Sequence, residues 1–318
     1  MCTLQTTTLI DEFEQPLKSM EDYEKALTHI LSKCPNLKNY LQHFVLPTPG
    51  DWPTWFYQKK LIAQRSNLSL HSIIPEQGPF HVFLNLQEDI VKMYHFILKP
   101  IYKEIFGSDL PLKPKPYRIN ILINAVFLGW LKIRSKVLQK FKLCKDIEFS
   151  CILHMLEEAM PIGFCLYSLV YRSGVLSDYV EVMLRLLVLF IVWKRKHYHK
   201  STLSMLSDLW HHKENLKKYY DLKKYWMTLI TEKKVEIWHS VLRHNIQVYD
   251  KADQIQSKAI ALAASKSEQD FQAQFLKPYK RGCTEKDLSM IAGKSAEVLL
   301  STIKAIGQNL GKSEKVWH

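Results

Sequence analysis

Apolar residues recur at helical spacing along most of the chain. In the segment 20–33 they fall at Tyr23, Leu27, Ile30 and Leu31, which predicts an amphipathic helix. Cys34-Pro35 is expected to end it, because a residue that precedes proline avoids the helical conformation. The same spacing predicts further helices over 54–64, 86–106, 118–142, 146–172, 176–196, 201–211, 213–230, 233–264 and 284–310.

Short apolar runs between turn-forming residues predict a few strands before residue 110. They are Phe44-Val45-Leu46, Ser72-Ile73-Ile74 and the run from Gly78 to Leu84. The proline-rich segment 107–116 predicts a linker. We therefore expect a mostly helical α+β fold, in which an acidic helical segment (1–40) and a small strand-containing portion (41–110) precede a helical portion (111–232) and C-terminal helices (233–318).

Composition supports a folded chain that attracts polyanions. The 318 residues are 47% hydrophobic and 24% charged, which is enough apolar surface for a sizeable core and excludes a mainly disordered protein. Lys and Arg number 44 against 31 Asp and Glu, which gives a net charge of +13. Such a charge favours binding to nucleic acid or to an anionic membrane.

The N-terminus and the cysteines predict a reduced, intracellular location. No positive start with an apolar run is present, so we expect no secretion. The six cysteines are scattered, without the spacing of a zinc knuckle or a redox motif. The most apolar run, 183–193, is about half the roughly 20 residues of a membrane span and contains Arg185. We therefore expect no membrane span.

Positive charge is concentrated in two stretches. Residues 111–145 contain nine basic residues and no acidic one, and residues 194–234 contain eleven basic against four acidic residues. Aromatic residues are interleaved with the second stretch, as in grooves that bind a phosphate backbone and stack bases. This pattern predicts nucleic-acid contacts for Lys194, Arg195, Lys196 and Lys200. It is also typical of solvated helix faces whose rings point into the core.

Two acidic positions are candidates for catalysis. Asp51 follows a predicted strand and precedes a helix, where α/β folds place catalytic carboxylates, although Gly-Asp between prolines is also ordinary turn chemistry. Glu236, His239 and Arg243 share a polar stripe of a predicted helix. Such a stripe can hold a divalent metal and a phosphate, or pair with itself at the surface.

Four short motifs together resemble a known family. They are Pro49-Gly50-Asp51-Trp52-Pro53, Gly78-Pro79-Phe80-His81-Val82, Lys113-Pro114-Lys115-Pro116 and the stretch from Val235 to Arg243. The chain resembles, over about residues 40–300, an uncharacterised domain-of-unknown-function family of transposon-like open reading frames in fungi and animals. The order of elements is similar to a ribonuclease-H-like transposase core with a helical insertion. This implies a partial core at 41–110, the insertion at 111–232 and helices that complete the core after 233.

The resemblance also implies roles for the candidate residues. In such cores carboxylates clamp two divalent metal ions that activate water and stabilise the leaving oxygen. Asp51 and Glu236 would then be catalytic ligands of Mg²⁺ or Mn²⁺, with His239 and Arg243 beside the metal or on a phosphate. The strands and the first aspartate that should precede Asp51 are not visible. We therefore expect a truncated, inactive nuclear protein that binds DNA non-specifically; the alternative is a helical protein–protein interaction module with no nucleic-acid role.

Overall fold

The computed structural model describes residues 15–65, 70–114, 116–141, 144–167, 169–170, 175–211 and 284–313, and scattered positions between 247 and 261. Of the described residues 78% are helical and 5% are in strands, which confirms a mostly helical fold with a small sheet. Contacts divide the chain into two units that alternate along the sequence. Unit 1 is Met1–Val82, Val170–Glu181 and Arg195–Leu276, and unit 2 is Phe83–Leu169, Val182–Lys194 and Lys277–His318.

Unit 1 begins with α1 (Met20–Lys33), whose bounds are those predicted. Ser19 and Asp22 form a capping box, in which the Ser19 hydroxyl accepts from the Asp22 N–H and the Asp22 carboxylate accepts from the Ser19 N–H. The expected end of this helix at Cys34-Pro35 is confirmed, and a second helix that was not predicted, α2 (Pro35–Tyr40), starts there. A proline at the first helical position costs no hydrogen bond.

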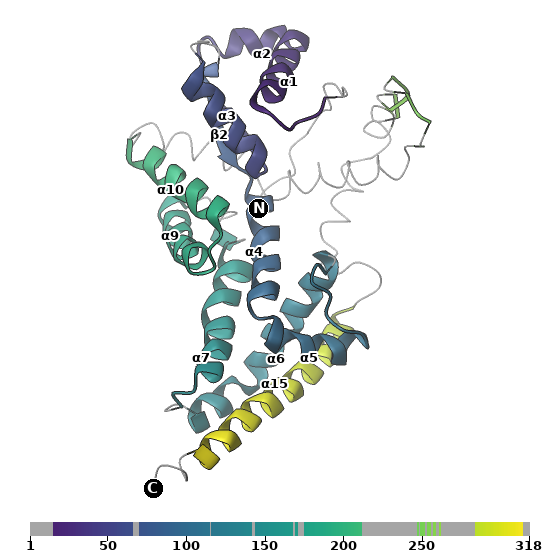
Figure 1. The fold of residues 1–318 in the computed structure, drawn as a ribbon, viewed down its shortest axis with the longest axis vertical. Helices are drawn as coiled ribbons and strands as arrows, with labels where there is room; N and C mark the ends of the chain where they lie inside the picture. Colours follow the sequence, from purple (N-terminus) through teal and green to yellow (C-terminus); the bar gives the residue numbers. More distant parts are fainter. Residues whose placement is uncertain are drawn as a thin grey trace. The chain divides into compact units, whose positions relative to one another are not determined.

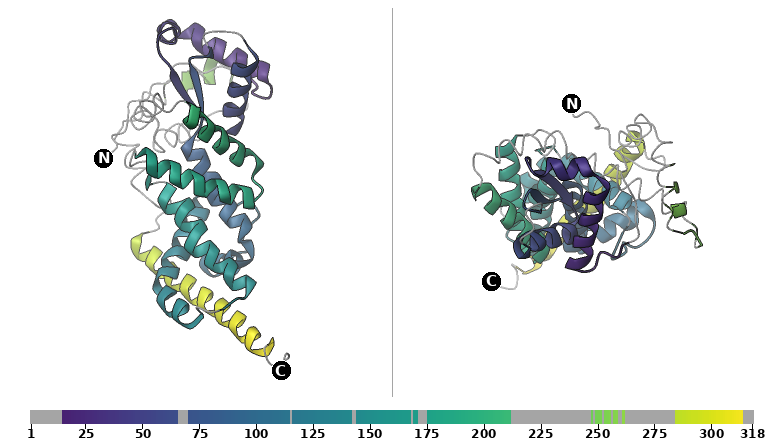
Figure 2. Two further views of the ribbon diagram at one scale, coloured as in Figure 1. Left: turned by 90° about the vertical axis from the view of Figure 1, so that its left-hand side faces the viewer. Right: turned by 90° about the horizontal axis from the view of Figure 1, so that it is seen from above.

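The two strands of unit 1 form a parallel pair joined by a helix. β1 (Leu46–Gly50) lies beside β2 (Ile73–Gln77), with Leu46 opposite Ile73 and Gly50 opposite Gln77. α3 (Trp52–Gln64) lies in the crossover that parallel strands require. α1, α2, α3 and β2, drawn from two further sides in Figure 2, share one core. Its buried members are Tyr23, Leu41, Leu61, Leu70 and Ile73.

Two predictions about the strand region are wrong. The run from Gly78 to Leu84 forms no strand, because α4 (Pro79–Met93) begins there and buries Val82, Leu86 and Ile90 at helical spacing. Phe44 and Val45 lie before β1 and are exposed. Aromatic and β-branched residues favour strands only weakly, so the burial of one helical face decides the structure. The single helix predicted at 86–106 is two helices, α4 and α5 (His95–Phe106), with a break at Tyr94.

Unit 2 is built around two long helices that lie side by side, α6 (Pro116–Phe141) and α15 (Glu285–Ser313) (Figure 1). Gly129 allows their close approach, because a Cβ there would lie 2.7 Å from the carbonyl oxygen of Ala292. α5 also packs against α15. The predicted linker 107–116 joins α5 to α6 within unit 2, and Gly107 ends α5 in the left-handed conformation, with φ 66°.

The helical segment after α6 is irregular. α7 (Ile147–Leu153) continues into two π-helical stretches, η2 (His154–Ala159) and η3 (Pro161–Leu166). Pro161 has no N–H to donate to the preceding turn, which accounts for a locally widened helix. Among the described residues, this one helix, Ile147–Leu166, is long and apolar enough to cross a membrane by length and composition, and 44% of its most apolar window is buried.

Two helices follow the irregular segment. α9 (Leu176–Val192) crosses from unit 1 into unit 2, and α10 (Lys196–His211) belongs to unit 1. α10 begins five residues before the predicted start at 201, so Lys196 and Lys200 lie on its first turns. Between the two helices Lys194 has φ 55°. The helix predicted at 213–230 and most of the one predicted at 233–264 lie outside the described residues.

Candidate nucleic-acid interface

Asp51 stands between the end of β1 and the start of α3, as the sequence predicted. Its Oδ1 atom accepts a hydrogen bond of 3.1 Å from the backbone N–H of Thr54 and so caps the helix. Gly50 is required beside it, because a Cβ at position 50 would lie 2.5 Å from Cγ2 of Thr54. The described contact of the Asp51 carboxylate is therefore that of a helix cap, and its role as a metal ligand stays a prediction.

α10 lies alongside α3, to which two side-chain contacts fix it within unit 1. The rings of Trp52 and His197, near the starts of the two helices, have centroids 4.5 Å apart. Lys59 Nζ, farther along α3, lies 2.5 Å from a carboxylate oxygen of Asp208 on α10. The Ser201 hydroxyl donates to Oε1 of Gln77 at the carboxyl end of β2. The start of α10 is thereby held near the carboxyl ends of both strands.

Cations gather at the start of α10. Lys194, Lys196 and Lys200 are exposed, and Arg195 is half-buried. The first turn of α10 contains no acidic residue. Because the helix dipole makes an N-terminus positive, cations there raise the local potential further and favour a bound anion. Across the described part of the chain, no ion pair involves any of the three exposed lysines.

Aromatic rings of α3 lie next to these cations. Trp52 stacks on Phe56 at 5.6 Å and packs on Trp55 at 4.9 Å, and 40% of Phe56 is exposed. The packing of Trp52 on His197 joins this row to the start of α10. Trp52 and Phe56 have no role predicted from the sequence, although their spacing of four residues on a helix places them on one face. The aromatic rings of α3 and the cations of α10 are about 140 residues apart in the sequence, and only the contact between the two helices brings them together.

The predicted metal site is only half described. Asp51 is placed, whereas Glu236, His239 and Arg243 lie outside the described residues, so their position relative to Asp51 stays a prediction. Within the described ranges, no group of three or more His, Cys, Asp and Glu side chains is arranged to hold a metal ion.

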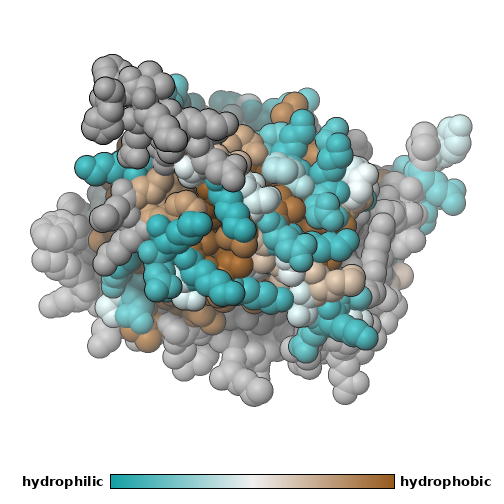
Figure 3. Space-filling view, turned by 90° about the horizontal axis from the view of Figure 1, so that it is seen from below, coloured by the Kyte–Doolittle hydropathy of each residue, from teal (hydrophilic) through white to brown (hydrophobic). Residues whose placement is uncertain are grey.

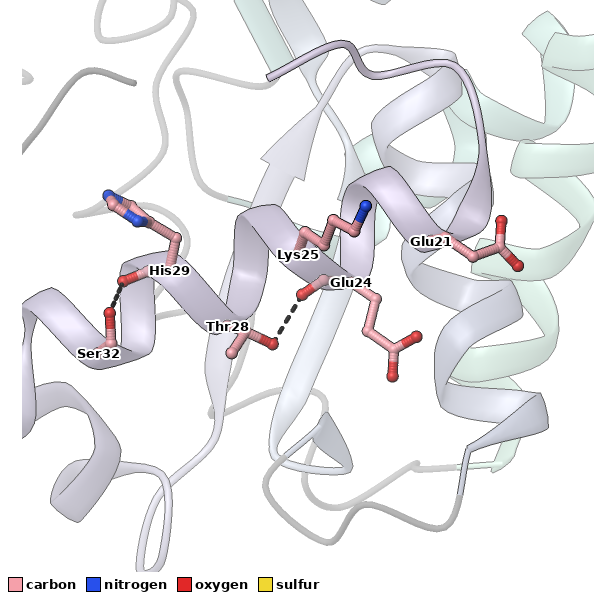
Figure 4. Close-up of a pocket in the computed structure, with 6 residues that line it drawn as sticks. All are labelled: Glu21, Glu24, Lys25, Thr28, His29 and Ser32. Atoms are coloured by element: carbon pink, nitrogen blue, oxygen red, sulfur yellow. Dashed lines mark hydrogen bonds between the residues drawn. The ribbon is translucent and has the colours of Figure 1, made fainter. Parts of the chain in front are cut away.

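A shallow depression of about 590 Å³ lies on α1 (Figure 4) and is lined by Glu21, Glu24, Lys25, Thr28, His29 and Ser32. All six residues come from one helix. The hydroxyls of Thr28 and Ser32 bond to carbonyl oxygens of the same helix, at 2.8 and 2.7 Å. Hydrogen bonds from its own backbone N–H and from Ser19 hold the pKa of Glu21 below its usual range. These contacts are local to α1, and the depression contains no convergent set of polar groups from different elements.

Comparison with known proteins adds no family to this description. No family model matches the chain, no curated protein matches it, and no solved structure matches it.

Proposed function

We propose that this chain is a DNA-binding protein derived from a transposase-like core, and that it contacts the phosphate backbone non-specifically through the cations at the start of α10. The observation that carries the proposal is the cluster of exposed lysines at the positive end of a helix, where the helix dipole disfavours cations unless an anion is bound. The net charge of +13 adds a long-range attraction for a polyanion. A nuclear location belongs to the same proposal.

The arrangement around Asp51 supports the proposed ancestry. An aspartate that directly follows one strand, precedes a helix and is followed by a parallel neighbouring strand has the placement that the resemblance implies for the second carboxylate of a ribonuclease-H-like core. In this proposal Asp51 and Glu236 would hold Mg²⁺ or Mn²⁺, and His239 and Arg243 would contact the metal site or a phosphate. Two carboxylates alone would bind a metal ion weakly, so catalytic turnover is not part of this proposal.

Fluorescence anisotropy with a labelled DNA duplex, measured over a range of salt concentrations, tests the DNA proposal. We expect K194Q/K196Q/K200Q to bind at least about tenfold more weakly near 0.1 M salt, and to reduce the slope of log K against log salt by about 0.9 for each phosphate that is no longer neutralised. The matched control K25Q/K33Q/K38Q removes the same charge from exposed positions of α1 and α2. Equal weakening of DNA binding in both triple variants would show that only the net charge matters, and not the position of the lysines. Absence of DNA binding by the parent chain at low salt would overturn the proposal.

Calorimetric titration of Mn²⁺ tests the metal part separately. We expect weak binding by the parent chain that disappears in Asp51→Asn and in Glu236→Gln. Asn caps a helix about as well as Asp, so weaker binding by Asp51→Asn would report on the ligand and not on the fold. Absence of Mn²⁺ binding by the parent would remove the metal site and leave the DNA proposal intact.

A protein–protein interaction module remains the second candidate, and one observation favours it. Several large apolar side chains of unit 2 are exposed, including Phe96, Leu131 and Met290, at 55%, 52% and 58%. One face of the molecule shows hydrophobic surface between polar side chains (Figure 3). Apolar surface that gathers in patches commonly marks a binding surface. DNA binding that is absent at every salt concentration would favour this candidate.

A further inference from the structure

One side of α9 exposes a stripe of large apolar side chains. Leu184, Val188, Ile191 and Val192 are exposed by 47%, 60%, 54% and 61%. The opposite side buries Met183, Leu186 and Phe190 in unit 2, and Trp193 packs on Tyr94 with ring centroids 6.3 Å apart. α9 is therefore apolar on both sides and covered on only one, and the uncovered side also carries the exposed side chains of Glu181 and Arg185.

The exposed stripe has the spacing of a helix–helix seam. Positions 184, 188 and 191 follow intervals of four and three residues, which is the alternation that keeps apolar side chains facing a second helix. An isolated apolar residue at a surface needs no explanation, but a continuous apolar stripe on one helix does. The spacing favours a helical occupant.

The charges at the two ends of the stripe indicate which helix that is. Asp178 and Glu181 lie exposed at the start of α9, and Lys194 lies exposed just after its end. A second copy of α9 that runs antiparallel places Glu181 of each copy near Lys194 of the other, whereas a parallel copy would bring like charges together. An anionic membrane surface would meet the two carboxylates unfavourably.

We propose that two copies of this chain associate through α9, antiparallel about a two-fold axis near Val188. Such an interface is self-complementary, so one patch supplies both sides. Leu184 of one copy then packs against Ile191 and Val192 of the other. Since one helix contributes most of the contact, the buried area falls at the low end of specific interfaces and the dimer dissociates readily.

Analytical ultracentrifugation without DNA tests the dimer. We expect the mass to rise from that of one chain towards that of two as the concentration increases from about 1 to about 100 μM, as a micromolar Kd requires. Val188→Glu should remain monomeric over this range. Leu203→Glu, at an apolar position of α10 that is 49% exposed, should behave as the parent chain. A parent chain that stays monomeric at the highest concentration overturns the proposal.

Cross-linking and charge exchange test the orientation. Val188→Cys should form an intermolecular disulfide under mild oxidation, since residue 188 of each copy lies at the axis, whereas Leu203→Cys should not. Glu181→Lys and Lys194→Glu should each weaken dimerisation several-fold, and the double variant should restore it. Failure of the double variant to restore the dimer overturns the antiparallel arrangement. Neither experiment involves DNA, so the outcome is independent of the proposed function.

Discussion

The side chain of Asp51 shows how one residue in a predicted catalytic position is held by local structure. Its carboxylate satisfies the N–H of Thr54, which has no partner within the helix. The strand end that makes Asp51 a candidate ligand also makes it the residue before a helix. One oxygen is engaged in the cap, and the role predicted from sequence has to be tested apart from it.

Substitution of Asp51 separates these roles. Asp51→Ala should lower the free energy of unfolding by about 1 kcal/mol, because the cap is removed. Asp51→Asn should leave stability within about 0.5 kcal/mol of the parent, because Asn is an equally good cap. Urea denaturation followed by circular dichroism measures both values. Equal destabilisation by Asn and Ala would show that the charge, and not the cap, supports the fold.

Glu157 links two positions of α6 to the irregular helix of unit 2. Its Oε1 accepts from Trp130 Nε1 at 2.5 Å and from Arg134 Nε at 2.8 Å, while Oε2 accepts from Arg134 Nη2 at 2.8 Å. These hydrogen bonds, with that from Arg134 the largest, hold the pKa of Glu157 below its usual range. Because the pKa of Glu157 is lower in the folded state, its ionised carboxylate stabilises the fold at pH values above the unfolded-state pKa near 4.5. This stabilisation is lost as the pH falls through the pKa of the folded state.

We therefore expect the free energy of unfolding to fall more steeply between pH 6 and pH 3 (approximate limits) in the parent than in Glu157→Gln. The difference should be about 1 kcal/mol, because the paired Arg134 is half exposed and solvent weakens the attraction. The neighbouring residue gives a matched control, Glu158→Gln, which should follow the parent. Parallel pH profiles for all three chains would contradict the assigned role of Glu157.

At the scale of elements, the approach of α6 to α15 depends on a missing side chain. A Cβ at Gly129 would lie 2.7 Å from the Ala292 carbonyl oxygen, 3.0 Å from the Ala296 N–H nitrogen and 3.1 Å from Ser295 Cβ. Two of these atoms are backbone and cannot rotate away. A glycine in a helix normally weakens it, so its presence on α6 has a packing reason.

Gly129→Ala should destabilise unit 2 by about 1–3 kcal/mol, because the helices must separate to admit the methyl group. Gly293→Ala is the matched control, since a Cβ at that position of α15 meets nothing within 4 Å. It should be neutral or raise stability by up to about 1 kcal/mol, from the better helix propensity of alanine. Thermal unfolding measures both changes, and an equal effect of the two substitutions would exclude the close contact as the cause.

The sequence predicts elements well where a local signal coincides with a burial pattern. The bounds of α1 follow from the apolar spacing within 20–33 and from Cys34-Pro35, and α3 and α15 begin within two residues of their predicted starts. The prediction is wrong at the start of α4, where Phe80, Val82 and Phe83 favour a strand locally but tertiary packing selects a helix. Of the candidate site, the place of Asp51 was predictable. The pairing of Trp52 with His197 was not, because it depends on a contact across the fold.

At the scale of the whole molecule, the chain divides into two compact units, and the described residues of each include buried apolar side chains. Leu61 lies in the core of unit 1 and Leu122 in that of unit 2, both almost fully buried. We expect Leu61→Ala and Leu122→Ala each to cost about 2–5 kcal/mol, each in the unit that contains it. Hydrogen exchange of backbone amides under native conditions should resolve the two effects. Equal reduction of protection in both units after either substitution would show one cooperative core.

The pairing of α6 with α15 has a consequence for synthesis on the ribosome. About 140 residues separate the end of α6 from the start of α15. At about 5–20 residues per second, roughly 7–30 s pass between translation of the two helices. During that interval the face of α6 around Gly129 stays uncovered, because α15 has not yet been synthesised. The growing chain therefore exposes a defined apolar surface that chaperones can bind.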